Sequence, residues 1–263
     1  MLRTRLATAA VAIPALLWLI FLAPPWLFAG ILIGITAVGL GEFAAMAIPT
    51  HRAFRIFAVV AGLGFAAAVV SNDPHALGIV LVLALGGGLL YALSDPDMPG
   101  AVARVANALV AALYVGFLLP HVVTLRLTVP GGDRWVFLAI GCAMAGDSAS
   151  YFAGRSFGKN KLFPRVSPNK TIEGAIGGLA GSLFFGVLLQ STMPPPGLDF
   201  PEVLGISLLL GLLAQAGDMV ESMLKRAYGT KDSGWIIPGH GGVLDRIDSL
   251  VLPFVFTYYL SAG

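Results

Sequence analysis

Long apolar stretches follow one another along this chain of 263 residues, with only short polar breaks between them. A helix needs about 17–25 mostly apolar residues to cross a bilayer, and the stretches are of that order. Hydrophobic residues make up 57% of the chain and charged residues 11%, whereas soluble domains average about 45–50% and about 25%. So few charged residues cannot cover the surface of a soluble domain of this size. The chain is therefore predicted to be an all-α, polytopic integral membrane protein.

We predict about nine membrane-spanning helices from the length of the apolar stretches. The first of them follows Arg3 and Arg5 and resembles the charged and apolar parts of a secretory signal peptide. Its length and its direct continuation into the second stretch favour a retained helix. The predicted spans are residues 6–23, 26–48, 54–71, 76–93, 101–122, 135–153, 174–193, 202–221 and 248–261.

The basic residues predict the orientation of these spans. All Lys and Arg residues except Arg126 and Arg134 fall on one side if every second break is assigned to the same side. Cytoplasmic loops carry an excess of Lys and Arg, so that side is predicted to be cytoplasmic. An odd number of spans then places the N-terminus in the cytoplasm and the C-terminus outside. Two cytoplasmic segments, 154–173 and 222–247, hold most of the charged residues of the second half.

Several classes of protein are excluded by simple counts. A single cysteine, Cys142, rules out a disulfide framework and a cysteine-ligated zinc site. A net charge of +2 gives no indication of nucleic-acid binding. No repeat divides the chain, so we predict one membrane domain, 1–263, with N-terminal helices of weak motif content (1–140) and a catalytic half (141–263). Glu42 is the exception in the first half: an ionisable group in a span is costly, and the sequence suggests only a position near a helix end or a pair with an Arg.

The richest segment begins at the end of the eighth span and runs into the ninth. On a helix, Asp218, Glu221 and Ser222 share one face with Lys225. Asp245 and Asp248 are one turn apart at the start of the last span. Acidic residues at two helix ends that face each other make an oxygen-rich site for a hard cation such as Mg²⁺.

Basic residues and a glycine turn adjoin these acids. Lys and Arg side chains bind phosphate oxygens, and the turn at 238–242 exposes backbone N–H groups to an anion. A solvated connector that follows the charge bias is the plainer reading, and His240 is then a turn-stabilising imidazole. The mixture of acids and bases at the ends of spans favours phosphoryl chemistry assisted by a metal. The residues concerned are Lys225, Arg226, Lys231, His240, Gly241, Gly242 and Arg246.

The second rich segment lies between the sixth and seventh spans. Asp147 and Tyr151 are a helical turn apart and are predicted to face one cavity. The stretch from Ser167 reads as a turn into the seventh span, with Asn169 as the expected helix cap. Lys170 beside a helix N-terminus is a natural site for a phosphate.

These two segments resemble the phosphatidate cytidylyltransferases, also called CDP-diacylglycerol synthases. The likeness covers roughly the C-terminal half and is strongest over a pattern of fixed spacing from Ser222 to Asp248. Two small departures, at Ser150 before the Tyr and at Ile172, concern local packing. The matching residues are Ser222, Lys225-Arg226, Lys231-Asp232, Gly234, Ile237-Pro238, His240-Gly241-Gly242, Asp245-Arg246 and Asp248, with Asp147, Tyr151, Gly154-Arg155, Phe157-Gly158-Lys159 and 167–174 upstream.

The resemblance implies that CTP and phosphatidate give CDP-diacylglycerol and pyrophosphate, with Mg²⁺ held by Asp218 and Asp245. It implies a multi-pass protein of the inner membrane with a site that faces the cytoplasm, and it leaves a second, monovalent cation and a homodimer open. A CTP-dependent polyprenol kinase, another membrane phosphotransferase, or an ion or phosphate transporter are the alternatives. The implied catalytic residues are Asp147, Asp218, Lys225, Arg226 and Asp245. The implied substrate-binding residues are Tyr151, Ser167, Lys170, Glu221, Ser222, Lys231, Asp232, His240, Gly241, Gly242, Arg246 and Asp248.

Overall fold

The computed structural model describes residues 2–234 and 241–262, and side chains from residue 12 onward. Most of the described chain is helical, with one antiparallel pair of short strands. The all-α prediction is confirmed. The elements in order are α1 (Leu2–Phe21), α2 (Pro25–Ala47), α3 (Arg52–Ser71), α4 (Pro74–Ala92), α5 (Met98–Ala111), η1 (Ala112–Phe117), α6 (His121–Thr128), α7 (Gly132–Phe157), β1 (Lys161–Phe163), β2 (Ser167–Thr171), α8 (Ile172–Thr192), α9 (Phe200–Ala227) and α10 (Leu244–Ala262).

Within the described residues, seven helical stretches are long and apolar enough to cross a membrane. They are α2, α3, α4, α7, α8, α9 and the stretch Met98–Thr128, which comprises α5, η1 and α6. The chain is thus a multi-pass membrane protein. Nine spans, and the sides on which the termini lie, stay predictions, because α1 and α10 are not among the seven.

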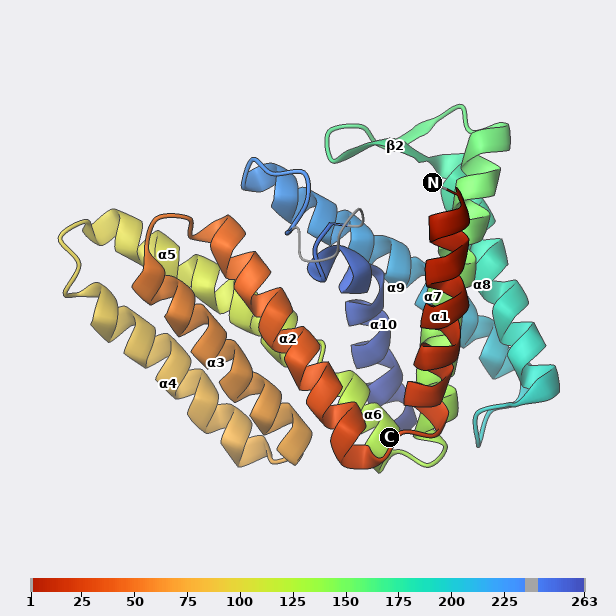
Figure 1. The fold of residues 1–263 in the computed structure, drawn as a ribbon, viewed down its shortest axis with the longest axis horizontal. Helices are drawn as coiled ribbons and strands as arrows, with labels where there is room; N and C mark the ends of the chain where they lie inside the picture. The colour runs from red at the N-terminus through yellow and green to blue at the C-terminus, as the bar shows by residue number, and fades with distance from the viewer. Residues whose placement is uncertain (1, 235–240, 263) are drawn as a thin grey trace.

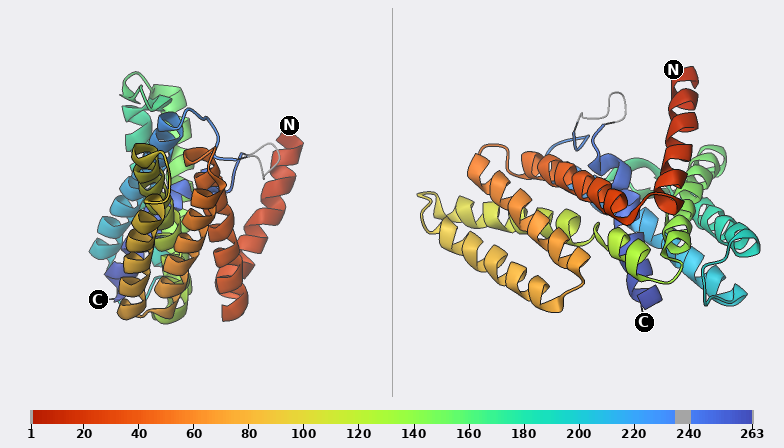
Figure 2. Two further views of the ribbon diagram at one scale, coloured as in Figure 1. Left: turned by 90° about the vertical axis from the view of Figure 1, so that its left-hand side faces the viewer. Right: turned by 60° about the horizontal axis from the view of Figure 1, so that its bottom comes forward.

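The helices form two groups that meet at α10 (Figure 1). In the first group, α3 packs against α2, α4, α5 and η1. In the second, α7 packs against α8, α9 and α10, and α10 also contacts α6 and α2. The right-hand view in Figure 2 shows α3 and α4 on one side of the molecule and α8 and α9 on the other. The C-terminal helix and α6 therefore join the plain N-terminal helices to the helices that carry the charged motifs.

The fifth predicted span, 101–122, is interrupted. An α-helix ends at Ala111, a π-helical turn follows over Ala112–Phe117, and α6 begins after Pro120. Proline lacks a backbone N–H and cannot continue the hydrogen-bond ladder. A side chain on Gly116 would collide with the backbone oxygen of Gly62, so η1 and α3 approach each other closely at two glycines.

Both charged segments contain regular secondary structure among the residues that the structure describes. Helix α7 continues to Phe157, β1 pairs with β2, and α9 continues to Ala227. The prediction that Asn169 caps α8 is wrong, because Asn169 lies in β2. Thr171 is still extended (φ −124°, ψ 155°), and its hydroxyl accepts a hydrogen bond from the Gly174 N–H at 3.1 Å, which makes it the cap.

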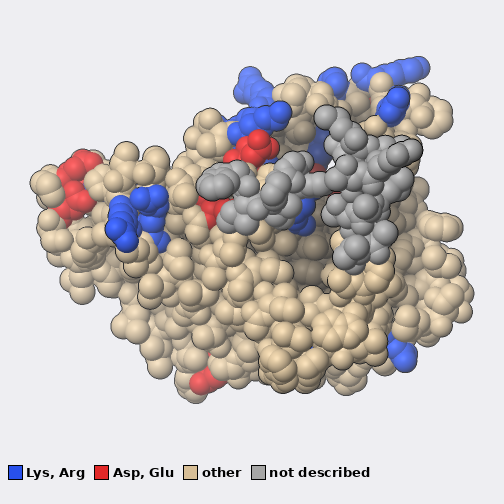
Figure 3. All heavy atoms as spheres, viewed as in Figure 1, with Lys and Arg blue, Asp and Glu red and all other residues tan. Residues whose placement is uncertain are grey.

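Charged side chains gather at one end of the molecule. Figure 3 shows Lys and Arg atoms along the upper edge, where the β1–β2 hairpin and the C-terminal end of α9 lie in Figure 1. The opposite edge is nearly free of them in this view. This distribution is the spatial counterpart of the basic-residue asymmetry in the sequence.

Candidate active site

A cavity of about 520 Å³ opens between α7, β2, the start of α8 and α9. Four residues of the predicted site line it from three different elements: Asp147 and Tyr151 on α7, Lys170 on β2 and Asp218 on α9. Their common cavity confirms the expectation that Asp147 and Tyr151 face one space. The other lining residues are Ser150, Gly154, Arg155, Leu162, Asn169, Thr171, Gly174, Ala175, Gln215 and Met219.

An ion pair lies in this cavity. The Lys170 Nζ atom is 2.5 Å from the Asp218 Oδ2 atom, and the two side chains are 30% and 28% exposed. The Ser222 hydroxyl, one turn further along α9, donates a long hydrogen bond of 3.5 Å to the other oxygen of Asp218. The β1–β2 hairpin is what brings Lys170 over α9. Because Lys170 is only partly buried, its ammonium group can release the Asp218 carboxylate and bind a phosphate oxygen at a small desolvation cost.

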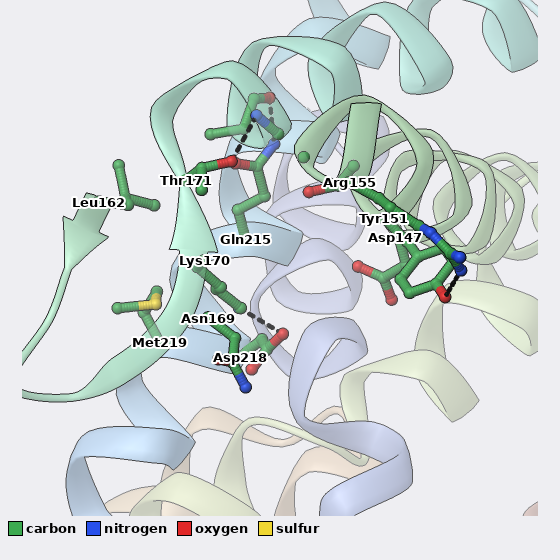
Figure 4. Close-up of a pocket in the computed structure, with 14 residues that line it drawn as sticks. Asp147, Tyr151, Arg155, Leu162, Asn169, Lys170, Thr171, Gln215, Asp218 and Met219 are labelled. Atoms are coloured by element: carbon green, nitrogen blue, oxygen red, sulfur yellow. Dashed lines mark hydrogen bonds and ion pairs between the residues drawn. The ribbon is translucent and has the colours of Figure 1, made fainter. Parts of the chain in front are cut away.

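Further carboxylates lie near the ion pair. Figure 4 shows the Asp147 carboxylate facing the Lys170–Asp218 pair from α7, while the Tyr151 ring turns toward Arg155. The Tyr151 hydroxyl accepts a hydrogen bond of 3.1 Å from Arg155. Asp147, Asp218 and Asp248 lie close enough to repel one another electrostatically. This end of the cavity therefore favours a positively charged ligand.

Helices α9 and α10 come into close contact beside Asp218. A Cβ atom on Gly217 would collide with the backbone oxygen of Asp248. Since the obstacle is backbone, it cannot rotate away. This glycine sets the distance between the helix that carries Asp218 and the helix that carries Asp245 and Asp248.

We expect Gly217→Ala to lower the free energy of unfolding by about 1–3 kcal/mol, because the added methyl group overpacks the contact between α9 and α10. Gly205→Ala is the matched control in the same helix, since nothing lies within 4 Å of a Cβ atom there. Thermal unfolding of both variants in one detergent is the measurement. Equal unfolding temperatures for the two variants would contradict the close contact.

A second cluster lies where α9 ends and α10 begins. The Lys225 Nζ atom is 2.5 Å from the Glu221 carboxylate and 2.6 Å from the Asp245 Oδ1 atom. Glu221 is fully buried, and the Lys225 side chain is 13% exposed. Lys225 thus joins the two helices by ion pairs. Glu221 and Lys225 share a face of α9, as their spacing predicts.

Asp245 also accepts hydrogen bonds from residues other than Lys225. Its Oδ2 atom accepts from the Ser233 N–H at 3.0 Å, the Ser233 hydroxyl at 2.9 Å and the Gly242 N–H at 2.8 Å. Burial raises the pKa of this carboxyl, but the hydrogen bonds from Lys225, Gly242 and Ser233 outweigh it and bring the pKa to about 2. Asp245 is therefore ionised at neutral pH, and its two oxygens accept hydrogen bonds from Lys225, Ser233 and Gly242.

The remaining predicted residues lie further out. Arg226 is exposed and donates to the backbone oxygens of Val166 (3.4 Å) and Thr230 (3.3 Å), which ties α9 to the hairpin. Asp232 lines a separate cavity of about 600 Å³ against α2. His240 lies outside the described residues. Lys231 and Arg246 are exposed, Ser167 is half-buried in β2, and Gly241 has a positive φ of 82°, which favours glycine.

Two residues of the site were missed by sequence reasoning. Gln215 lies one turn before Asp218 and donates to the backbone oxygen of Ala175 at 3.1 Å, which holds α9 against α8 at the cavity wall. Ser233 joins Asp245 to the loop. A polar amide inside an apolar span was the available signal for Gln215, whereas nothing in the sequence distinguishes Ser233 from its neighbours.

Comparison with known proteins places the chain in context. The sequence profile of the Cytidylyltransferase family matches residues 3–262, which extends the likeness through the N-terminal half as well. The chain is 42% identical over 152 residues to the phosphatidate cytidylyltransferase of Bacillus subtilis, a match that spans 58% of this chain and only 56% of that protein. It is 44% identical over 149 residues to the enzyme of that name from Brucella suis, with 57% of this chain and 54% of the relative matched. The Haemophilus influenzae phosphatidate cytidylyltransferase is 34% identical over 290 aligned positions that cover 98% of each chain.

Proposed function

The chain belongs to the cytidylyltransferase family, and from that premise we propose that it transfers the cytidylyl group of CTP to phosphatidate, giving CDP-diacylglycerol and pyrophosphate. The observation that carries the proposal is the cavity in which Lys170 and Asp218 form an ion pair opposite Asp147. The names of the relatives from Bacillus and Haemophilus support the choice of substrates.

The proposed reaction needs no activated side-chain nucleophile. A phosphate oxygen of phosphatidate, already ionised at neutral pH, attacks the α-phosphorus of CTP. The bond between the α-phosphorus and the oxygen that bridges to the β-phosphate breaks, and pyrophosphate leaves with that electron pair. The task of the protein is to align two anions that repel each other and to stabilise charge on the leaving group.

The residues of the cavity are suited to this task. Lys170 exchanges Asp218 for a phosphate oxygen and so offsets part of the repulsion between the two substrates. Tyr151 and Arg155 form the outer rim on α7, and Asn169 and Gln215 offer amide hydrogen bonds to the substrates. Lys231, Arg226 and Arg246 add positive charge at the cytoplasmic surface. Asp232, in the separate cavity against α2, and Ser167, in β2, stay proposed substrate-binding residues. Asp248, Glu221 and Lys225 maintain the contact between α9 and α10.

Mg²⁺ is the proposed cofactor, with Asp218 and Asp245 as its protein ligands. In the part of the chain that the structure describes, no three His, Cys, Asp or Glu side chains are grouped as a metal site. Mg²⁺ is commonly bound by one or two carboxylates and completed by substrate phosphates and water, so the oxygen donors present fit it. When bound, the ion would neutralise charge on the triphosphate. Asp245 would then exchange part of its contact with Lys225, which frees that lysine for a phosphate.

The site is proposed to face the cytoplasm from the inner membrane, with the N-terminus inside and the C-terminus outside. The basic residues support this orientation, since the end of the molecule that carries the cavity also carries most of them. CTP is then available from the cytoplasm. Phosphatidate arrives from the adjacent leaflet with its acyl chains among the apolar helices. A second, monovalent cation and a homodimer are consistent with the proposal but carry no part of it.

The purified protein in detergent is expected to convert CTP and phosphatidate into CDP-diacylglycerol and pyrophosphate in the presence of Mg²⁺. Excess EDTA is expected to stop the formation of both products, and an excess of Mg²⁺ added afterwards to restore it. The lipid product is measured by mass spectrometry and pyrophosphate by a coupled assay. If neither product forms in the presence of Mg²⁺, the proposed function is wrong; formation that continues in EDTA would remove the metal from the account.

A further inference from the structure

Glu42 is a buried acidic residue in the otherwise apolar helix α2, five positions before the helix ends. Its side chain is 6% exposed. The Oε1 atom accepts a hydrogen bond from the Val243 N–H at 3.0 Å, and the Oε2 atom accepts one from the Leu244 N–H at 2.9 Å. The Ser233 hydroxyl adds a longer bond to Oε2 at 3.4 Å. The two carboxylate oxygens thus hold two consecutive backbone amides about 200 residues away in sequence.

These two amides belong to the start of α10. The first N–H groups of a helix have no partner within the helix, and the positive end of the helix dipole favours a negative charge. Capping residues usually lie next to the helix in sequence. Here a glutamate from α2 supplies the cap from another element. These hydrogen bonds compensate the cost of burying Glu42 in the membrane. Of the two explanations offered by the sequence, a position near a helix end agrees with its place five residues before the end of α2.

The same carboxylate is connected to Asp245 through Ser233. The Ser233 hydroxyl contacts Glu42 and Asp245, and the Gly242 N–H donates to Asp245. Side chains on Gly234 or Gly242 would collide with the Glu42 carboxylate or with Ser233. Glu42 and Asp245 therefore hold the backbone at both Ser233 and Gly242–Leu244, and the two glycines allow this close approach.

We propose that Glu42 is a positioning residue of the active site: it fixes the first turn of α10, and with it Asp245, at the end of α9 that carries Lys225. The inference concerns how the site proposed above is assembled, so its catalytic part rests on the proposed function. Glu42 touches neither substrate nor metal in this account. It gives the N-terminal helices a direct role in a site otherwise formed by the second half of the chain.

Glu42→Gln tests the structural part without any substrate. The amide nitrogen of Gln cannot accept a hydrogen bond, so one of the two backbone amides loses its partner. We expect hydrogen exchange of the peptide over residues 241–249 to become at least about tenfold faster, as measured by mass spectrometry. Glu202→Gln is the matched control, since Glu202 also accepts from a backbone amide, that of Asp199, at a helix start remote from the site. Exchange in Glu42→Gln equal to that of the wild type would overturn the inference.

Kinetic measurements distinguish a positioning role of Glu42 from a role in stability alone. At a temperature where the variant stays folded, Glu42→Gln is expected to lower kcat at least about tenfold and to raise the Mg²⁺ concentration for half-maximal rate, with KM for phosphatidate changed less than about twofold. Glu42→Asp keeps a carboxylate on a shorter side chain, and its kcat is expected to lie between those of the wild type and Glu42→Gln. A variant that loses thermal stability while kcat and Mg²⁺ dependence stay unchanged would contradict the proposal.

A second variant covers the case in which Glu42→Gln does not fold. Ser233→Ala removes the hydroxyl shared by Glu42 and Asp245, and it is expected to accelerate exchange over 241–249 about threefold or more. Unchanged exchange in Ser233→Ala would then count against the inference. If the wild-type protein forms no CDP-diacylglycerol, the proposed function fails, whereas the exchange measurements still decide whether Glu42 holds α10.

Discussion

Asp218→Asn is expected to lower the rate of CDP-diacylglycerol formation by at least about 10²–10³-fold, the range seen when one preorganised electrostatic contact is removed from an active site. The substitution removes the negative charge that pairs with Lys170 at 2.5 Å and the carboxylate proposed to bind Mg²⁺. Asn has nearly the same volume, so the packing of α9 against α8 is expected to persist. The measurement is the initial rate at saturating CTP and phosphatidate.

Asp133→Asn is the control for this variant, because Asp133 lies in the first turn of α7, at the other end of the helix that carries Asp147. The control is expected to keep a rate within about twofold of the wild type, as surface substitutions away from a site usually do little. Both variants should elute as the wild type does from a sizing column. A near-normal rate for Asp218→Asn would remove Asp218 from the active site.

Asp245→Asn is expected to reduce the rate to a similar extent and, unlike Asp218→Asn, to lower the unfolding temperature by several degrees. The reason is structural: Asp245 accepts from Lys225, Ser233 and Gly242, and an amide nitrogen cannot replace either carboxylate oxygen as an acceptor. Lys225 would keep Glu221 as its only partner among the contacts described above. Rates and thermal unfolding are measured on the same preparation. A variant as active and as stable as the wild type would show that Asp245 neither binds metal nor orders the loop.

The sequence was sufficient for whatever depends on spacing within one helix. The turn between Asp147 and Tyr151 and the shared face of Asp218, Glu221 and Lys225 follow from the 3.6-residue period. Seven of the predicted spans coincide with helical stretches apolar enough to cross a membrane, and their ends agree within six residues. The gathering of charge at one end of the molecule follows from the alternating sides of successive spans.

Contacts between distant elements were beyond that reasoning. No periodicity indicates that a glutamate in the second helix caps the last one, since the two are separated by some 200 residues and only the fold brings them together. The fate of Lys225 is similar: its charge suggested a phosphate ligand, and the structure shows it between two carboxylates. Asn169 was predicted to be a helix cap because the sequence did not reveal the β1–β2 hairpin. The pairing of two short strands across a turn depends on both strands, and Asn169 lies in the second of them.

The two clusters describe one connected site. Asp218 lines the cavity with Lys170, and the Glu221–Lys225–Asp245 cluster begins one turn further along the same helix, so α9 contributes to both. The close contact at Gly217 joins α9 to α10 beside Asp218. Lys170 pairs with Asp218 and Lys225 pairs with Asp245, and these are the two carboxylates proposed to bind Mg²⁺. If Mg²⁺ were held by Asp218 and Asp245, Lys170 and Lys225 would be available to bind the phosphate oxygens of CTP and phosphatidate.

The position of the label in CTP tests the central claim most directly. CTP labelled with ³²P at the α-phosphate or at the γ-phosphate is supplied separately with phosphatidate and Mg²⁺ to the purified protein. Cytidylyl transfer predicts that the α-label enters the lipid and the γ-label is recovered in pyrophosphate. A γ-label in lipid would indicate a kinase. If neither form of labelled CTP labelled the lipid, and ions or phosphate crossed the membrane of sealed vesicles without CTP, the protein would be a transporter. That result would contradict the account.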